Sequence, residues 1–416
     1  MASPNEAPQP RKITADISTI DGTSQTTITL EENKDATQPP KLLDISKRAL
    51  ESPLPDKQSS QRETHVIVSI GSGGRQAEPF FQNVVKPILT AIHGEDGVSK
   101  FKIHTTTSEA SISDLTNNIF FPAANSGNPI RIILLSGDGG IVDLVNGLVP
   151  PPQSDAYVPP EVVLLPLGTA NALYHSINAG KPLSWGINTL GSTVSKPLPV
   201  FTASFSPGAR LLVDEARSEQ SLPQNEDGNG VLHGAVVASW GMHASLVGDS
   251  DTAHYRQYGV ERFKMAAKEA LYPADGAAPH AYKACIEVFQ NGQWIQLEQQ
   301  EHMYVLATLV SHLEQPFCIS PSTSPLDGSM RLVHFGPTSG DDAMRIMGLA
   351  YQGGSHVHDP AVRYEDIDGL RIRFKGMEKD SRWRRICVDG KIVRVEADGW
   401  VEIRKNQKRA LNVVVV

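Results

Sequence analysis

One pattern occurs three times between residues 62 and 180: a short apolar run, a loop with glycine, then apolar residues at helical spacing. The runs are HVIVSI, IRIILL and VVLLP, and the loops behind them are GSGGR, SGDGG and LGTAN. Continuous apolar strands that alternate with helices are typical of a parallel sheet covered by helices on both faces. We therefore predict an α/β domain over residues 62–199.

The pattern changes beyond about residue 200, where apolar and polar residues alternate with a period of two. Segments such as VLHGAVVASWG, MYVLATLV and RRICVDGKIVRVE have strand length, and several end in Asp-Gly or glycine-rich turns. One helical pattern, YRQYGVERFKMAAKEAL, interrupts them. Residues 200–416 are therefore predicted to form an antiparallel β domain, which gives an α/β plus all-β fold.

Residues 1–61 differ from both domains in composition. They are rich in Pro, Ser, Thr, Gln and charged residues and poor in aromatic ones, so we expect them to be mostly disordered. One segment favours structure, because KITADISTIDGTSQTTITL alternates apolar and polar residues around Asp21-Gly22. Such a sequence is typical of a β-hairpin.

Composition excludes several classes of function. The formal net charge of −8 argues against a protein that grips nucleic acid through its phosphates. The three cysteines are far apart and form no CxxC pair, which fits a reducing compartment. No signal-peptide core and no apolar stretch of roughly 20 residues is present, so we expect a cytoplasmic protein.

The glycine loops predict a phosphate site. A loop between a parallel strand and a helix lets backbone N–H groups approach an anion. Glycine is also the usual residue of a tight turn, so one such loop alone is also compatible with a plain turn. Three of them open on the same crevice of a parallel sheet. None has the P-loop pattern or the dinucleotide pattern GxGxxG with its following acid, so a phosphate site of another kind remains.

Asp138 lies inside the second glycine loop. A carboxylate in a phosphate cradle repels the phosphate unless it serves the chemistry, by binding Mg²⁺ or by accepting a proton from an attacking hydroxyl. The alternative is that Asp138 caps the helix that begins near Gly139. Spacing alone leaves both interpretations open.

The same motifs carry a family resemblance. SGDGGIVDLVNGL resembles the GDG motif of the diacylglycerol-kinase-type lipid kinases, and PLGTANALYHSI resembles their second motif, GTGN or GSGN. The likeness continues through ASWGMHASLV, HYRQYGVERF, VLATLVSHL and CVDGK and covers residues 62–405. Within that family, the order WG, YR…G…RF, SHL and VDG is similar to that of the sphingosine kinases.

The resemblance implies a kinase of two domains. An N-terminal α/β domain like that of NAD kinases and diacylglycerol kinases would hold ATP with Mg²⁺, and a C-terminal antiparallel β-sandwich would hold a lipid. Asp138 would be the general base for the primary hydroxyl of a sphingoid base or similar lipid. Nucleotide contacts are implied for Ser69, Gly71, Gly73, Gly74, Ser136, Gly137, Gly139, Gly168, Thr169, Asn171, Arg256, Arg262, Asp389, Gly390 and Lys391. Substrate contacts are implied for Asp143, Ser245 and Asp249. No residue is assigned as a metal ligand, and a lipid substrate implies peripheral membrane contact.

The chain departs from the family pattern in four ways. Ser69 and Ile70 replace an Asn and a Pro of the first loop, Ala170 replaces a glycine of the second motif, and Lys391 replaces the Glu of DGE. The Asp that meets the substrate ammonium in sphingosine kinases aligns with Ser245, and Asp249 or Asp251 is a candidate replacement. These changes keep three alternatives open: a diacylglycerol kinase, a ceramide kinase, and a relative that binds without catalysis.

Other enzyme classes fit the sequence less well. NAD kinases share the GDG motif but not the WG…YR…RF order. A serine hydrolase would need a GxSxG elbow, which is absent. A metal hydrolase would have to use His356, His358 and Asp359 in SHVHD, which we interpret as plain surface residues.

Overall fold

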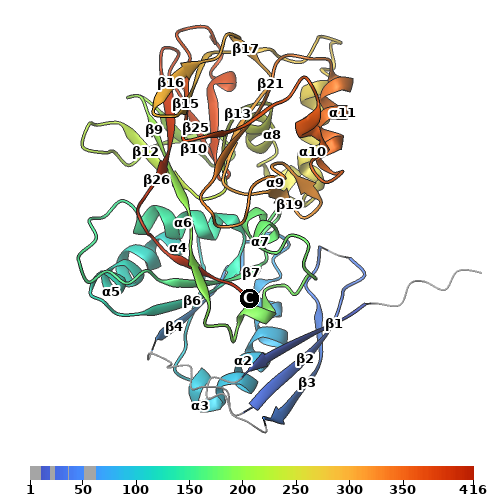
Figure 1. Ribbon diagram of the computed structural model, residues 1–416, viewed down its shortest axis with the longest axis vertical. Coiled ribbons are helices and arrows are strands. Elements are labelled where there is room, and N and C mark those ends of the chain that lie inside the picture. Colours follow the sequence, from blue (N-terminus) through green and yellow to red (C-terminus); the bar gives the residue numbers. More distant parts are fainter. Residues whose placement is uncertain (1–10, 19–23, 36, 51–61) are drawn as a thin grey trace, which may run out of the picture.

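The computed structural model describes residues 11–18, 24–35, 37–50 and 62–416. Two domains lie along the long axis of the molecule (Figure 1). The first contains the parallel sheet and the second contains two antiparallel sheets. This arrangement confirms the α/β plus all-β prediction.

The first domain is built on a six-stranded sheet. Its order is β5 (Lys102–Thr105), β4 (Glu63–Val68), β6 (Ile130–Ser136), β7 (Glu161–Pro166), β27 (Asn412–Val414) and β8 (Ser195–Pro197). The strands from β5 to β27 are parallel, and β8 is antiparallel. The helical segments of this domain are α1 (Ala77–Phe80), the π-helical η1 (Phe81–Val85), α2 (Lys86–His93), α3 (Glu95–Val98), α4 (Ser111–Leu115), the π-helical η2 (Thr116–Phe120), α5 (Phe121–Asn125), α6 (Asp138–Leu148), α7 (Ala172–Ile177) and the 3₁₀ turn η3 (Ile187–Thr189).

Both faces of this sheet are buried, because successive side chains of a strand point to opposite sides. In β6, Ile132 and Leu134 pack with α6 and the second domain, whereas Ile133 and Leu135 pack with the α1–η1–α2 helix. The continuous apolar runs of the sequence follow from this double coverage.

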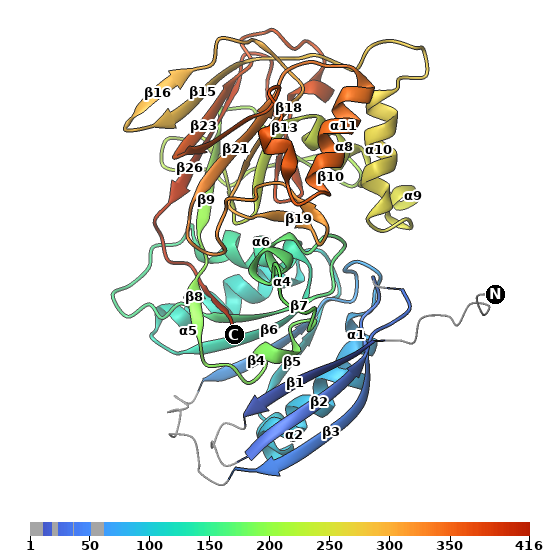
Figure 2. The ribbon, with the colours of Figure 1, turned by 45° about the vertical axis from the view of Figure 1, so that its right-hand side comes forward.

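A second, three-stranded antiparallel sheet covers the outer side of the α1–η1–α2 helix (Figure 2). It consists of β1 (Lys12–Ser18), β2 (Ser24–Glu31) and β3 (Lys41–Ala49). The predicted hairpin is confirmed, since Ser18 pairs with Gln25 and the ladder continues along both strands. The Asp21-Gly22 turn and residues 1–10 and 51–61 lie outside the described residues.

The expectation of a mostly disordered N-terminal segment does not hold for these three strands. The apolar residues are few, but alternation places them on one face of the sheet. Ile13, Ile17, Ile28 and Leu30 are buried against the helix and the residues around Trp185. The composition of the segment did not reveal this apolar partner surface.

The second domain is a sandwich of two antiparallel sheets, which confirms that prediction. The larger sheet has the order β11 (Ser218–Ser221), β10 (Arg210–Val213), β25 (Lys391–Arg394), β24 (Arg385–Val388), β13 (Val237–Gly241), β18 (Tyr304–Thr308), β21 (Met330–Phe335), β22 (Arg363–Ile367). The smaller sheet has the order β12 (Gly230–Gly234), β9 (Val200–Phe205), β26 (Trp400–Asn406), β23 (Gly369–Arg373), β15 (Cys285–Gln290), β16 (Gln293–Gln296). Their inner faces share one core, in which Phe205 and Trp240 are fully buried.

Shorter elements complete this domain. Two small ladders pair β14 (Tyr282–Lys283) with β17 (Glu301–His302) and β19 (His312–Glu314) with β20 (Phe317–Cys318). The helical segments are α8 (Met242–Asp249), α9 (Ala253–Arg256), α10 (Glu261–Leu271), α11 (Gly340–Ala350), η4 (Ser355–His358) and η5 (Ser381–Arg384). Helices α10 and α11 lie along one side of the sandwich (Figure 2). Within the described ranges, no helix is long and apolar enough to cross a membrane.

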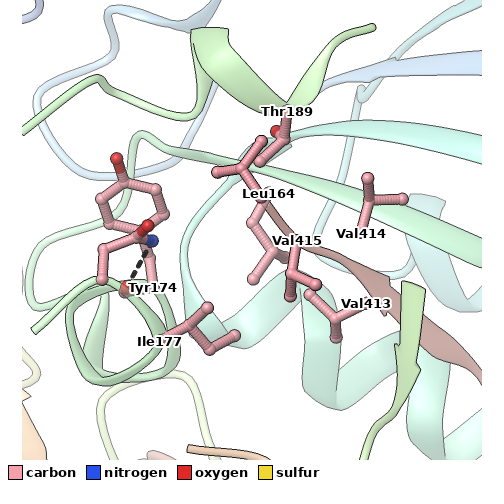
Figure 3. Close-up of a pocket in the computed structure, with 9 residues that line it drawn as sticks. Leu164, Tyr174, Ile177, Thr189, Val413, Val414 and Val415 are labelled. Carbon is pink, nitrogen blue, oxygen red and sulfur yellow. Dashed lines mark hydrogen bonds between the residues drawn. The ribbon is translucent and has the colours of Figure 1, made fainter. Parts of the chain in front are cut away.

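The end of the chain returns to the first domain. Strand β27 lies between β7 and β8, and the hydroxyl of Ser192 donates to the carbonyl of Val415 at 2.6 Å. A small apolar pocket lies against this strand, lined by Leu164, Tyr174, Ile177, Thr189 and the C-terminal valines (Figure 3). None of the glycine loops contributes to it, so we do not regard it as the nucleotide site.

Candidate active site between the two domains

The three glycine loops meet at the carboxyl ends of β4, β6 and β7. These strands are parallel neighbours, so their loops emerge side by side. A Cβ built on Gly168 would lie 2.4 Å from the Cα of Gly137, and a Cβ on Gly73 would lie 2.6 Å from the carbonyl oxygen of Leu167. Glycine at these positions therefore allows the backbones of the loops to touch.

Replacing Gly168 with Ala is expected to destabilise the first domain, because the added methyl group meets backbone rather than a movable side chain. Overpacking of this kind typically lowers the free energy of unfolding by about 1–3 kcal/mol. Thermal unfolding measures the effect. Gly139→Ala is the matched control, since a Cβ there has nothing within 4 Å. Equal melting temperatures for the two variants would contradict the close approach of the loops.

The first loop, residues 69–75, offers hydrogen-bond donors. Among the described residues, the backbone N–H groups of Gly71, Gly73 and Gly74 have no acceptor. The hydroxyl of Ser72 lies 3.0 Å from that of Ser69 and 3.0 Å from that of Ser136, which ties this loop to the end of β6. Free amides beside a hydroxyl chain suit the oxygens of a phosphate group.

In the second motif, the side chain of Asn171 hydrogen-bonds back to the backbone of its own loop. This residue has φ +55°, its Oδ1 accepts from the N–H of Gly168 at 2.8 Å, and its Nδ2 donates to the Gly168 carbonyl at 3.1 Å. The Asn171 side chain therefore holds the loop in shape, while Thr169 and Ala170 are half-buried beside it.

Asp138 is the first residue of α6, and its carboxylate binds the start of a different helix. Oδ2 accepts from the N–H of Ala172 at 2.7 Å and Oδ1 from the N–H of Leu173 at 3.0 Å. The alternative that Asp138 caps its own helix does not hold among the described residues: the N-cap of α6 is Gly137, which makes no side-chain cap bond, and the Asp138 carboxylate caps α7 instead. Burial raises the pKa of this carboxyl, and the hydrogen bonds from the Leu173 and Ala172 amides oppose that rise.

Asp389, from the late VDG segment, is fixed in a similar way in the second domain. Its carboxylate accepts from the N–H groups of Ala235 at 2.6 Å, Val236 at 3.1 Å and Val237 at 2.6 Å. Burial, together with the nearby charge of Asp138, raises the pKa of Asp389 to about 7. Asp389 thus orders the 235–237 segment and lies within electrostatic reach of Asp138.

Lys391 joins the two domains. Its Nζ lies 2.9 Å from Oδ1 of Asp143, on α6 of the first domain. Burial raises the pKa of Asp143, and the charge of Lys391 opposes that rise. Lys391 and Asp143 therefore form one ion pair, although the resemblance assigned Lys391 to the nucleotide and Asp143 to the substrate.

The resemblance implies that Lys391 contacts the nucleotide, so Lys391→Glu is expected to weaken ATP binding more than lipid binding. The change also places two carboxylates against each other at the domain interface. The KM for ATP should rise several-fold, and the melting temperature should fall. The double variant Asp143→Lys/Lys391→Asp restores an opposite-charge pair and should recover most of the lost stability. Failure of this swap to recover any stability would show that the ion pair is unimportant.

The arginines of YR…RF lie on the second domain and share one acid. Asp251 Oδ1 lies 3.0 Å from Nε of Arg256 and 3.5 Å from Nη1 of Arg262. Arg256 also interacts electrostatically with Glu109, which follows β5 in the first domain. Glu109 did not stand out in the sequence, since no motif contains it.

The positions assigned to substrate are already occupied by partners. Asp249 is ion-paired with Arg382 at 2.7 Å and Arg385 at 2.8 Å. Ser245 is buried and accepts a hydrogen bond from the hydroxyl of Tyr282 at 2.9 Å. The RWRR segment before CVDG was the available signal for these arginines. Nothing in that segment indicated that Asp249 would be the partner of these arginines.

SHVHD does not form a metal centre. His356 is fully buried, so the interpretation of SHVHD as plain surface is wrong for this residue, which η4 turns inward. His358 is exposed, and Asp359 is ion-paired with Arg345. In the described part of the chain, no group of three or more His, Cys, Asp and Glu side chains could hold a metal ion.

The parallel sheet with its three converging glycine loops, joined to an antiparallel sandwich, can be compared with the domains of known proteins. Residues 63–202 match the diacylglycerol kinase catalytic domain family. This match covers about a third of the chain, and it agrees with the resemblance drawn from its motifs.

Individual relatives extend this likeness to most of the chain. Rat sphingosine kinase 1 is 24% identical over 334 residues, covering 72% of this chain and 80% of that protein. Mouse sphingosine kinase 1 is 23% identical over 361 residues, covering 80% and 86%. A solved diacylglycerol kinase structure from Bacillus anthracis str. Sterne has a TM-score of 0.53 at 12% identity, covering 85% and 97%. That structure supports the fold.

Proposed function

We propose that this protein transfers the terminal phosphoryl group of ATP to the primary hydroxyl of a sphingoid base or a similar lipid. The observation that carries the proposal is the Asp138 carboxylate. It is anchored by the Ala172 and Leu173 amides where three glycine loops converge, and it lies within electrostatic reach of the second domain. Such an enzyme would be cytoplasmic and would contact a membrane peripherally to reach its substrate.

In this proposal the first loop binds the phosphates through its free backbone N–H groups and Ser72. Asp138 accepts the hydroxyl proton while the hydroxyl oxygen bonds to the γ-phosphorus. The bond from that phosphorus to the β–γ bridging oxygen breaks, and ADP leaves. Arg256 and Arg262 would exchange Asp251 for phosphate oxygens, which guanidinium groups bind well.

Mg²⁺ fits the residues present. Magnesium is commonly held by one or two carboxylates together with substrate phosphates, so a dedicated protein cage is not required. Each Asp138 oxygen keeps a lone pair beyond its amide bond, which would let this residue share in holding the ion. When bound, the ion would neutralise charge on the transferring phosphoryl group.

A second candidate is a kinase for a neutral lipid, such as diacylglycerol or ceramide. The observation that favours it is the state of the candidate ammonium ligands. Asp249 and Asp251 are each shared by two arginines, and Ser245 carries no charge. A substrate ammonium would have to displace these arginines.

One experiment distinguishes the candidates. The protein is incubated with radiolabelled ATP and a panel of sphingoid base, ceramide, diacylglycerol and monoacylglycerol in mixed micelles, with Asp138→Asn as the control. Label in the sphingoid base that disappears in the variant supports the first candidate. Label only in neutral lipids supports the second. No label in any lipid, with ATP binding intact, supports a non-catalytic relative.

A further inference from the structure

The N-terminal sheet reaches the nucleotide loop. Its β2–β3 connection, of which residues 32–35 and 37–40 are described, lies at the end of the sheet that faces the second domain (Figure 2). The sheet packs on the α1–η1–α2 helix, and the 69–75 loop leads directly into that helix. The connection is thereby brought beside the glycines that line the predicted phosphate site.

The approach is close at Gln38. Its Nε2 lies 3.6 Å from the position that a Cβ on Gly74 would occupy. The side chain is half-buried, and among the described residues its amide has no hydrogen-bond partner. The adjacent N–H groups of Gly73 and Gly74 are likewise without acceptors in this part of the chain. An unused carboxamide thus lies next to a row of unused backbone donors.

The connection holds Gln38 in place. Asp35 Oδ1 accepts from the backbone N–H of Thr37 at 2.9 Å and from its hydroxyl at 2.6 Å, and the Gln38 N–H donates to the Asp35 carbonyl at 3.0 Å. Pro39 and a buried Pro40 follow and restrict the backbone further. A fixed backbone lowers the entropy lost when the side chain binds a ligand.

We infer that Gln38 is a nucleotide-binding residue, which the N-terminal sheet contributes to the site of the catalytic domain. Its amide donates to a phosphate or ribose oxygen of ATP beside the Gly74 backbone. A carboxamide suits this place because it donates without adding charge and keeps a second donor and an acceptor for the rest of the nucleotide. This inference depends on the proposed function, since it requires ATP at the 69–75 loop.

Two variants of Gln38 test the inference in the full-length protein. Gln38→Met keeps the length of the side chain and removes its polar atoms, so the Kd and KM for ATP should rise about ten-fold, as for loss of a hydrogen bond to a charged group. Gln38→Glu should raise them further, because a carboxylate repels the phosphates. The kcat and the lipid KM should remain unchanged for both variants.

The matched control is Gln25→Met, at the opposite end of β2. The Gln25 side chain binds Arg48 on β3, away from the nucleotide loop. This variant should bind ATP like the wild type. A loss of affinity in the control equal to that of Gln38→Met would overturn the inference, because the sheet would then act only through its stability.

Hydrogen exchange gives a readout that is independent of turnover. Adding ATP with Mg²⁺ should slow amide exchange in residues 37–42 of the wild type and have a smaller effect in Gln38→Met. Wild-type ATP binding with unchanged Kd in both Gln38 variants overturns this inference alone. Absence of ATP binding by the wild type overturns it together with the proposed function.

Discussion

Asp138→Asn should lower kcat by at least about 10³-fold, because it removes the carboxylate that we propose as the acceptor of the hydroxyl proton. Positioned general bases contribute about 10²–10⁴-fold, and this one also helps to hold the reacting groups. The amide of Asn cannot accept from both Ala172 and Leu173, since one side of it is a donor. The melting temperature should therefore also fall slightly. Single-turnover kinetics with saturating ATP and lipid measure the chemical step directly.

The control is Asp114→Asn, which neutralises an exposed aspartate on α4 of the same domain. It should leave kcat and the ATP Kd unchanged. Asp138→Asn should bind ATP within about threefold of the wild type, since we propose that the first loop binds the phosphates. A variant that retains a tenth or more of the wild-type kcat would contradict the role of Asp138 as general base.

Asp389→Ala should lower the free energy of unfolding by about 3–5 kcal/mol, because three backbone N–H groups would lose their buried acceptor. Urea unfolding followed by tryptophan fluorescence measures the loss. Asp368→Ala is the control, since its exposed carboxylate pairs with Lys405 at the surface and, among the described residues, with no other cation, so it should contribute little. Similar stabilities for the two variants would contradict the assigned role of Asp389.

The pH dependence of stability gives a further test of Asp389. Its pKa is about 7 in the folded protein and roughly 3.9 in an unfolded chain. Between these values the folded state retains a proton that the unfolded state has lost, so this residue makes stability fall as pH rises from about 4 to about 7. The decline should be on the order of 2–4 kcal/mol and should be absent in Asp389→Asn. If the free energy of unfolding changes equally with pH in the wild type and in Asp389→Asn, the pKa of Asp389 is not raised. The hydrogen bonds from the three amides would then stabilise the carboxylate at least as much as burial destabilises it.

Much of the first domain followed from the sequence. The runs that became β4, β6 and β7 are mostly apolar because both sheet faces are covered, and a single sequence is enough to recognise this property. The loops behind them contain glycines that the structure brings into backbone contact, such as Gly137 and Gly168. The nucleotide and substrate roles of the residues at these loops remain predictions.

The features that were missed depend on contacts between distant parts of the chain. Nothing in KLLDISKRA indicated that it would add a third strand to the N-terminal sheet, because its side chains are mostly exposed. The capping of α7 by Asp138 and the ion pair of Lys391 with Asp143 each need the tertiary arrangement to be known. The sequence therefore pointed to Asp138 and Lys391 as candidate site residues, but it lacked information about their partners.

The position of β27 has a consequence for how the protein is made. During synthesis the residues of β27 leave the ribosome after the whole second domain, so the parallel sheet has an open seam between β7 and β8 until those residues have emerged. The nascent first domain would then present two unsatisfied strand edges to chaperones or to other chains.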